Sequence, residues 1–169
     1  MTQTPDDDEA RHRMDALAGI VRSELAAAGL PVIPEDHPLG TAGALVMVDR
    51  PFLRGVLVDW AEHALLVDAG LGALGDDPFH EGAETAALTG LQKVIGDAMQ
   101  EAMEKILTAA GLEVTRTDHD HTPGQLLVTR RVTVSPWRAW HDAQFVRRYD
   151  TMRAAWNERN QAQRTAQDE

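Results

Sequence analysis

The sequence predicts an α+β fold, in which helices pack across an antiparallel sheet in the order α-β-β-(β)-α-β-β-α. Three features of the 169-residue chain predict this class. Apolar residues recur at helical spacing in three long segments, short apolar runs rich in β-branched residues lie between these segments, and glycine and proline separate the runs. With 43% hydrophobic and 25% charged residues, the composition is typical of a folded domain.

We expect the first helix over residues 7–28. Its apolar side chains recur at helical spacing, at Met14, Leu17, Ile20 or Val21, and Leu25. The acidic run at 6–9 suits a helix N-terminus, because carboxylates interact favourably with that end of the helix dipole. Gly29 is the expected stop, and Pro31 lies just beyond it.

Residues 31–34 are expected to form a short strand, and residues 44–48 and 55–60 a hairpin with a proline in its connection. Residues 61–69 are compatible with a short helix and with a third strand of the meander. The three glycines that follow, at 70, 72 and 75, predict a loop.

A second long helix is predicted over residues 80–110 and ends at Gly111. Its apolar stripe consists of Leu88, Leu91, Ile95, Ala98 or Met99, Ala102, Ile106 and Ala109. At about 30 residues this helix is longer than the average helix of a globular domain. One of its faces should therefore cross the whole sheet or extend into a partner.

Strands are then predicted at 113–118 and 125–134. Ser135 and Pro136 are expected to begin the last helix, as its N-cap and its first residue. The apolar stripe of this helix, which we expect in the core, consists of Phe145, Tyr149, Met152 and Trp156.

Two segments of the chain are similar to each other. Residues 25–46 and 107–128 share a helix end, the pattern Ala-Ala-Gly-Leu-x-Val, an Asp-His pair and a Leu-Val strand. Two readings stay open: an αββ duplication, with pseudo-repeats at about 8–60 and 84–135, and chance similarity raised by the many alanines.

We expect one domain over residues 8–160, between a disordered acidic tail at 1–7 and a frayed tail at 161–169. The chain has no cysteine, which excludes disulfide scaffolds, cysteine nucleophiles and thiolate zinc sites. The N-terminus lacks the pattern of a secretory signal, and no apolar run approaches the length of a membrane span. We therefore expect a cytoplasmic protein that does not enter a membrane.

The formal net charge of -11 argues against a nucleic-acid binder that uses its whole surface. The charge is unevenly distributed, because residues 1–112 carry -12 and residues 113–169 carry +1. The acidic part of one copy is therefore expected to attract the arginine-rich last helix of another copy.

Two predicted turns carry aspartate and histidine side by side. Asp36 and His37 follow the first short strand, and the turn at 119–124 brings Asp118, His119 and His121 together in sequence. Carboxylates and imidazoles are common ligands of divalent metals, so these five residues are the candidate metal site. The alternative is a pair of hydrophilic turns, in which aspartate hydrogen-bonds to the local backbone.

Motifs for other chemistry are missing or incomplete. The sequence has no Gly-x-Ser-x-Gly nucleophile motif. Residues 70–75 match Gly-x-Gly-x-x-Gly, but Asp76, Asp77 and Pro78 follow, where a dinucleotide site needs a helix and no negative charge. We therefore assign no catalytic residue and no organic cofactor.

The last helix combines aromatic and arginine side chains. Trp140 lies opposite the predicted stripe, so it is either an interface anchor or a cover for the sheet rim beside Trp137. Arg147 and Arg148 are candidate interface residues with it, because arginine and aromatic side chains bind proteins and also single-stranded nucleic acid.

Three functions follow, in this order of preference. The first is a non-enzymatic protein-binding or assembly protein, a homodimer formed through the long helix or the last helix. The second is a metal-dependent enzyme that uses the Asp-His turns, and the third is nucleic-acid binding through the last helix. The predicted order of elements is similar to that of small acidic secretion chaperones, a resemblance that implies protein binding and dimerisation.

Overall fold

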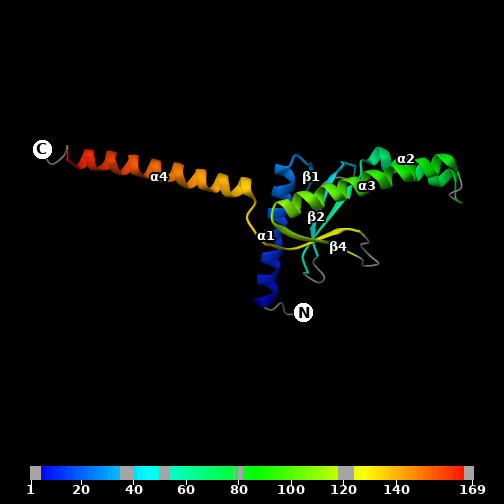
Figure 1. The fold of residues 1–169 in the computed structure, drawn as a ribbon, viewed down its shortest axis with the longest axis horizontal. Coiled ribbons are helices and arrows are strands. Elements are labelled where there is room, and N and C mark those ends of the chain that lie inside the picture. Colours follow the sequence, from blue (N-terminus) through cyan, green and yellow to red (C-terminus); the bar gives the residue numbers. More distant parts are fainter. Residues whose placement is uncertain are drawn as a thin grey trace. The chain divides into compact units, whose positions relative to one another are not determined.

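A computed structural model describes residues 5–34, 40–49, 54–77, 79, 82–117 and 124–165. These residues form helices and strands in the order α-β-β-β-α-α-β-β-α, which confirms the α+β class (Figure 1). The chain divides into two units, residues 1–133 and residues 134–169, and each unit is described separately.

Unit 1 begins with α1 (Pro5–Ala27), which starts two residues before the predicted helix. Gly29 has a φ of 87°, a left-handed conformation that glycine adopts without strain. The Leu30 N–H then donates to the Leu25 carbonyl at 3.1 Å, which satisfies one of the free carbonyl groups at the helix end. The predicted glycine stop is therefore confirmed.

The five described strands form one sheet in the order β1-β2-β3-β5-β4. Their bounds are β1 (Val32–Ile33), β2 (Gly43–Val48), β3 (Val56–Ala61), β4 (Leu112–Arg116) and β5 (Leu126–Arg131). The β2–β3 hairpin has the predicted antiparallel pairing, with Val46 opposite Val58, and β5 pairs antiparallel with both β3 and β4.

The prediction of an entirely antiparallel sheet is wrong, because β1 pairs with β2 in parallel. β1 has two residues, too few for a hydrophobic alternation that could indicate its direction. The parallel register places Val32 beside Ala44, and the Ala44 N–H donates to the Pro31 carbonyl at 2.8 Å.

The segment after β3 is a helix, α2 (Ala64–Asp76). Of the two alternatives for residues 61–69, the short helix is therefore confirmed over 64–69 and the third strand is wrong, as is the loop expected at the glycines 70, 72 and 75. His63 caps this helix, because its Nδ1 accepts a hydrogen bond from the Leu65 N–H at 3.2 Å. The low helix propensity of glycine is offset by packing, since α2 contacts α3 (Ala83–Ala109) along its length. The observed order therefore contains one helix that the predicted order lacks.

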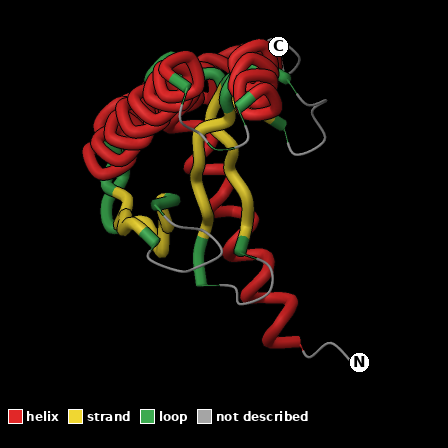
Figure 2. The backbone as a smooth tube through the Cα atoms, turned by 90° about the vertical axis from the view of Figure 1, so that its right-hand side faces the viewer, coloured by secondary structure: helices red, strands yellow, loops and turns green. Residues whose placement is uncertain are grey.

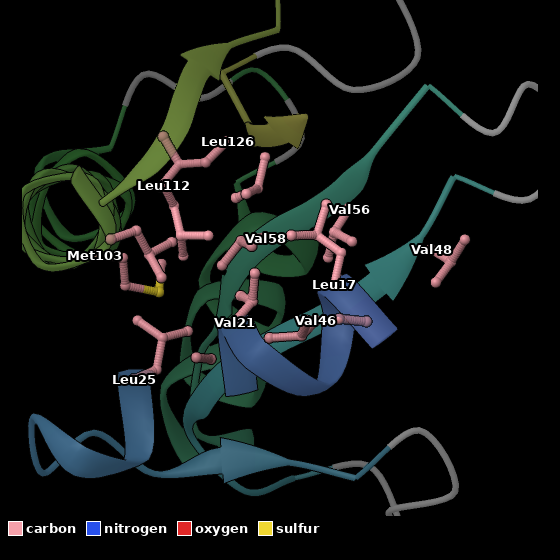
Figure 3. Close-up of a cluster of buried hydrophobic side chains, with 14 residues drawn as sticks. Leu17, Val21, Leu25, Val46, Val48, Val56, Val58, Met103, Leu112 and Leu126 are labelled. Carbon is pink, nitrogen blue, oxygen red and sulfur yellow. The ribbon is translucent and has the colours of Figure 1, made fainter. Parts of the chain in front are cut away.

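A single hydrophobic core lies between the sheet and helices α1 and α3 (Figure 3). Leu17, Val21 and Leu25 of α1 meet Val46 of β2 and Val58 of β3 there. Figure 2 shows α1 running along the strands toward the N-terminus. The predicted stripe of α1 is therefore confirmed.

The two similar segments share only part of their structure. Gly29 and Gly111 occupy equivalent positions in the alignment, and both have a positive φ, of 87° and 83°. The strands that follow differ, because β1 pairs in parallel with its neighbour and β4 pairs antiparallel. The likeness covers the helix end and the strand start, and a duplication of the whole αββ unit stays a prediction.

Candidate protein-binding surfaces

The five predicted metal ligands, Asp36, His37, Asp118, His119 and His121, lie outside the described residues. The strands that precede the two turns, β1 and β4, are the two edge strands of the sheet and run in opposite directions. Four strand spacings of about 4.8 Å put these edges about 19 Å apart. The described residues include no group of three His, Cys, Asp or Glu that could hold a metal ion, so the metal site stays a prediction.

A polar cluster around Asp59 ties the sheet to α3. Gln100 of α3 donates to Asp59 Oδ1 at 3.1 Å, and Gln125, just before β5, donates to Asp59 Oδ2 at 2.8 Å. The Trp60 backbone N–H also donates to Oδ1, at 2.8 Å. All three donors are amides, so the cluster holds the Asp59 carboxylate in place through hydrogen bonds alone. It marks the point where α3 leaves the sheet.

Beyond this point α2 and the first part of α3 form a helical hairpin, residues 64–98, which Figure 1 shows extending away from the strands. Gln92 of α3 holds the two helices together. Its Nε2 donates to Glu62 Oε2 at 3.1 Å and to the Leu66 carbonyl at 3.3 Å. A Cβ on Gly70 would lie 2.7 Å from Gln92 Oε1, so glycine permits this close approach.

Large apolar side chains of the hairpin are exposed to solvent. The exposed fractions are 74% for Leu65, 62% for Leu71, 81% for Phe79, 49% for Leu91 and 66% for Val94. The stripe predicted for the long helix is thus left partly uncovered at its first half. Exposed apolar side chains of this size mark candidate interaction surfaces, because their burial in an interface is favourable.

A hollow of about 440 Å³ lies at the tip of the hairpin. Its lining combines apolar groups of Ala69, Ala73 and Leu88 with the carboxylates of Asp76, Asp77 and Glu84. Asp77 Oδ2 accepts the Gly82 N–H at 2.7 Å, whereas Asp76 and Glu84 are exposed. The hairpin as a whole, residues 64–98, carries six carboxylates and one lysine, a net charge of -5.

Unit 2 is described as one helix, α4 (Pro136–Thr165). The predicted placement of its stripe in the core is wrong: the exposed fractions are 66% for Phe145, 56% for Tyr149, 70% for Met152 and 64% for Trp156. A single helix has no second element within its unit against which to bury a stripe. The sequence pattern found the stripe but could not show what covers it.

The three predicted interface residues are also on α4. Trp140 is 64% exposed, and Arg147 and Arg148 are both exposed. The Arg138 guanidinium lies 4.7 Å from the centroid of the Trp137 ring, a cation–π contact in the first turn of the helix. A role for Trp140, Arg147 and Arg148 in an interface stays a prediction, consistent with their exposure.

Comparisons with protein-family models, with curated proteins and with solved structures found no match to this chain. The resemblance to secretion chaperones in the order of elements therefore stays a prediction. Within the described part of the chain, no helix combines the length and the apolar character needed to cross a bilayer.

Proposed function

We propose that this chain is a non-enzymatic protein-binding or assembly protein that works as a homodimer in the cytoplasm. The observation that carries the proposal is the exposed apolar surface of the hairpin and of α4, with side chains such as Leu91, Val94 and Trp156 about half to two-thirds exposed. Interfaces are enriched in such aromatic and aliphatic anchors. The absence of cysteine from the sequence agrees with a reducing compartment.

The proposal is tested by light scattering coupled to size exclusion, across the micromolar range. We expect a dimer for the wild-type chain and a monomer for the double variant Leu91→Asp with Val94→Asp, because charge on an apolar interface must be desolvated. Ala86→Asp is the matched control, since Ala86 is exposed on the same helix away from Leu91. A wild-type chain that stays monomeric at every concentration contradicts the proposal.

A second candidate partner is single-stranded nucleic acid. It is supported by the exposed arginine and aromatic side chains of α4, among them Arg147, Arg148 and Trp140. Such binding would weaken with salt and would be lost in the double variant Arg147→Ala with Arg148→Ala. Wild-type chain that passes a single-stranded DNA column without delay at low salt rejects this partner.

A further inference from the structure

We propose that α4 of one copy docks on the α2–α3 hairpin of a second copy, and that two such contacts close a symmetric dimer. This inference rests on the proposed homodimer and names its two surfaces. The hairpin belongs to unit 1 and α4 belongs to unit 2, and the proposed contact joins the hairpin of one chain to α4 of another chain. The contact would bury the two sets of exposed apolar side chains against each other.

The docking face of α4 is the stripe of Phe145, Tyr149, Met152 and Trp156. Their spacing of four, three and four residues places them on one side of a helix with 3.6 residues per turn. The stripe is about 16 Å long at 1.5 Å per residue. Arg148 and Arg159, three turns apart, lie along one edge of it, whereas Trp140 and Arg147 lie on the other side of the helix.

The hairpin offers a receiving surface of matching length. α2 has 13 residues and is about 20 Å long. Leu65 of α2 and Leu91 of α3 are exposed on this hairpin, beside half-buried Leu88 and Ile95. An apolar stripe of about 16 Å can therefore lie along the hairpin with both of its ends in contact.

Charge decides which surface pairs with which. Residues 136–160 of α4 carry five arginines and three carboxylates, a net charge of +2, against -5 on the hairpin. A hairpin paired with another hairpin would bring two surfaces of -5 together, and like charges across an interface are destabilising. A second copy of this chain presents the acidic, apolar surface that the arginine-edged stripe of α4 fits.

The hollow at the hairpin tip suits an arginine of α4. Ala69, Ala73 and Leu88 would contact the apolar stem of such a side chain, and Asp76 and Glu84 would pair with its guanidinium. The same two surfaces exist on both copies, and the proposal includes the reciprocal contact, in which α4 of the second copy docks on the first. When both contacts form between the same two copies, the dimer is closed by a two-fold axis and does not grow into a chain.

Two charge-reversal variants of the full-length protein test this arrangement. The first changes α4 (Arg148→Glu with Arg159→Glu), and the second changes the hairpin (Asp76→Arg with Glu84→Arg). In a homodimer of either variant, both contacts bring like charges together, either two acidic or two basic surfaces. The dissociation constant of each variant should therefore rise about tenfold or more. In an equimolar mixture, both contacts of the heterodimer again join opposite charges, and the dimer should reappear in native mass spectrometry.

The matched control pair is Arg147→Glu and Asp97→Arg. Arg147 lies on the opposite side of α4 from the stripe, and Asp97 lies away from the hollow, where it pairs with Lys93 at 2.6 Å. We expect these two variants to dimerise as the wild type does, without preference for each other when mixed. Circular dichroism and urea unfolding check that all four variants fold, since every substituted residue is exposed.

A mixture that stays monomeric while the wild type dimerises overturns the reciprocal docking and leaves the proposed homodimer intact. If the hairpin variant dimerises more tightly than the wild type, the copies pair hairpin to hairpin, and the docking is also overturned. If the wild-type chain is a monomer, both the proposed homodimer and the docking of α4 on the hairpin are contradicted.

Discussion

The two halves of α3 lie in different surroundings and carry apolar side chains on different sides of the helix. Met103 and Leu107, in the second half, are fully buried against the sheet and α1. Leu91 and Val94, in the first half, are 49% and 66% exposed. At 100° per residue, Leu91 and Val94 lie about 160–180° around the helix from Leu107 and Met103, respectively. Each half therefore carries its apolar side chains on a different side, and neighbouring elements decide which side is covered.

Length is the physical reason for the difference. A helix of 27 residues is about 40 Å long, whereas a five-stranded sheet is about 19 Å wide. The part of α3 that precedes Gln100 in the chain extends past the sheet, and α2 covers one side of that part. The uncovered side is where we place the contact with a second copy.

The largest difference between the halves is expected in stability. Leu107→Ala removes a fully buried side chain and should lower the free energy of unfolding by about 2–5 kcal/mol, through lost burial and a cavity. Leu91→Ala at the exposed half should change it by less than about 0.5 kcal/mol. Urea unfolding, with the monomer isolated at low concentration, compares the two. Equal losses would contradict the contrast.

The second-largest difference between the two halves of α3 is expected in the rate of amide hydrogen exchange. Amides of residues 101–109 are expected to exchange near the rate of global unfolding, because that half is part of the core. Amides of residues 86–98 should exchange faster at low protein concentration, through opening of the hairpin, and slow down on dimerisation. Protection of residues 86–98 that does not depend on concentration would count against a contact at the hairpin.

A smaller effect is expected at the point where α3 leaves the sheet. Gln100→Ala removes one of the three donors to the Asp59 carboxylate and should cost about 1 kcal/mol of stability. Thr108→Ala, at an exposed position of the same helix, is the control and should leave the urea midpoint almost unchanged. If Gln100→Ala behaves like this control, the cluster does not fix α3.

The smallest effect is expected for the exposed pair of Glu101 and Lys105, whose charged atoms lie 2.6 Å apart. The hydrogen bond from Lys105 lowers the pKa of the Glu101 carboxyl below its ordinary 4.5, and the same contact raises the pKa of Lys105. A lowered carboxyl pKa stabilises the fold above 4.5, and this contribution is lost as the pH falls through the lowered value.

Because solvent screens such a pair, Glu101→Gln should leave the urea midpoint at pH 7 unchanged within error. The acid limb of the stability curve should become slightly less steep, since one fewer carboxylate takes up a proton on unfolding. A clear loss of stability at pH 7 that persists in high salt would show that Glu101 has a role beyond this pair.

Local patterns predicted the parts of the fold that depend on neighbouring residues in the chain. The stop at Gly29, the β2–β3 hairpin and the face of α1 with Leu17 and Leu25 all follow from turn chemistry and periodicity. The loop predicted at the glycines of α2 and the antiparallel direction of β1 were wrong. In α2, packing against α3 outweighs the low helix propensity of glycine. For β1, two residues are too few for a local pattern that indicates direction.

The features of the candidate surfaces also divide into those that local sequence patterns predicted and those that depend on tertiary packing. The sequence located the aromatic stripe of α4 and the arginines beside it, and the length of the predicted long helix already exceeded the width of the sheet. The stripe predicted for α3 is shifted from the observed one, because it lacks the buried Met103 and Leu107 and contains the exposed Leu91 and Ala109. The exposure of Leu65, Leu71 and Phe79 had no signal of its own, because their segment was expected to be a strand, a loop or a short helix.

By itself, the sequence determined the class of fold, the ends of the first two long helices and the sign of the charge along the chain. These follow from composition and from contacts between residues close in sequence. Only the tertiary structure decided which apolar side chains are buried. Burial depends on what lies opposite each face: the side of α3 with Met103 meets the sheet and α1, whereas the side with Leu91 meets solvent.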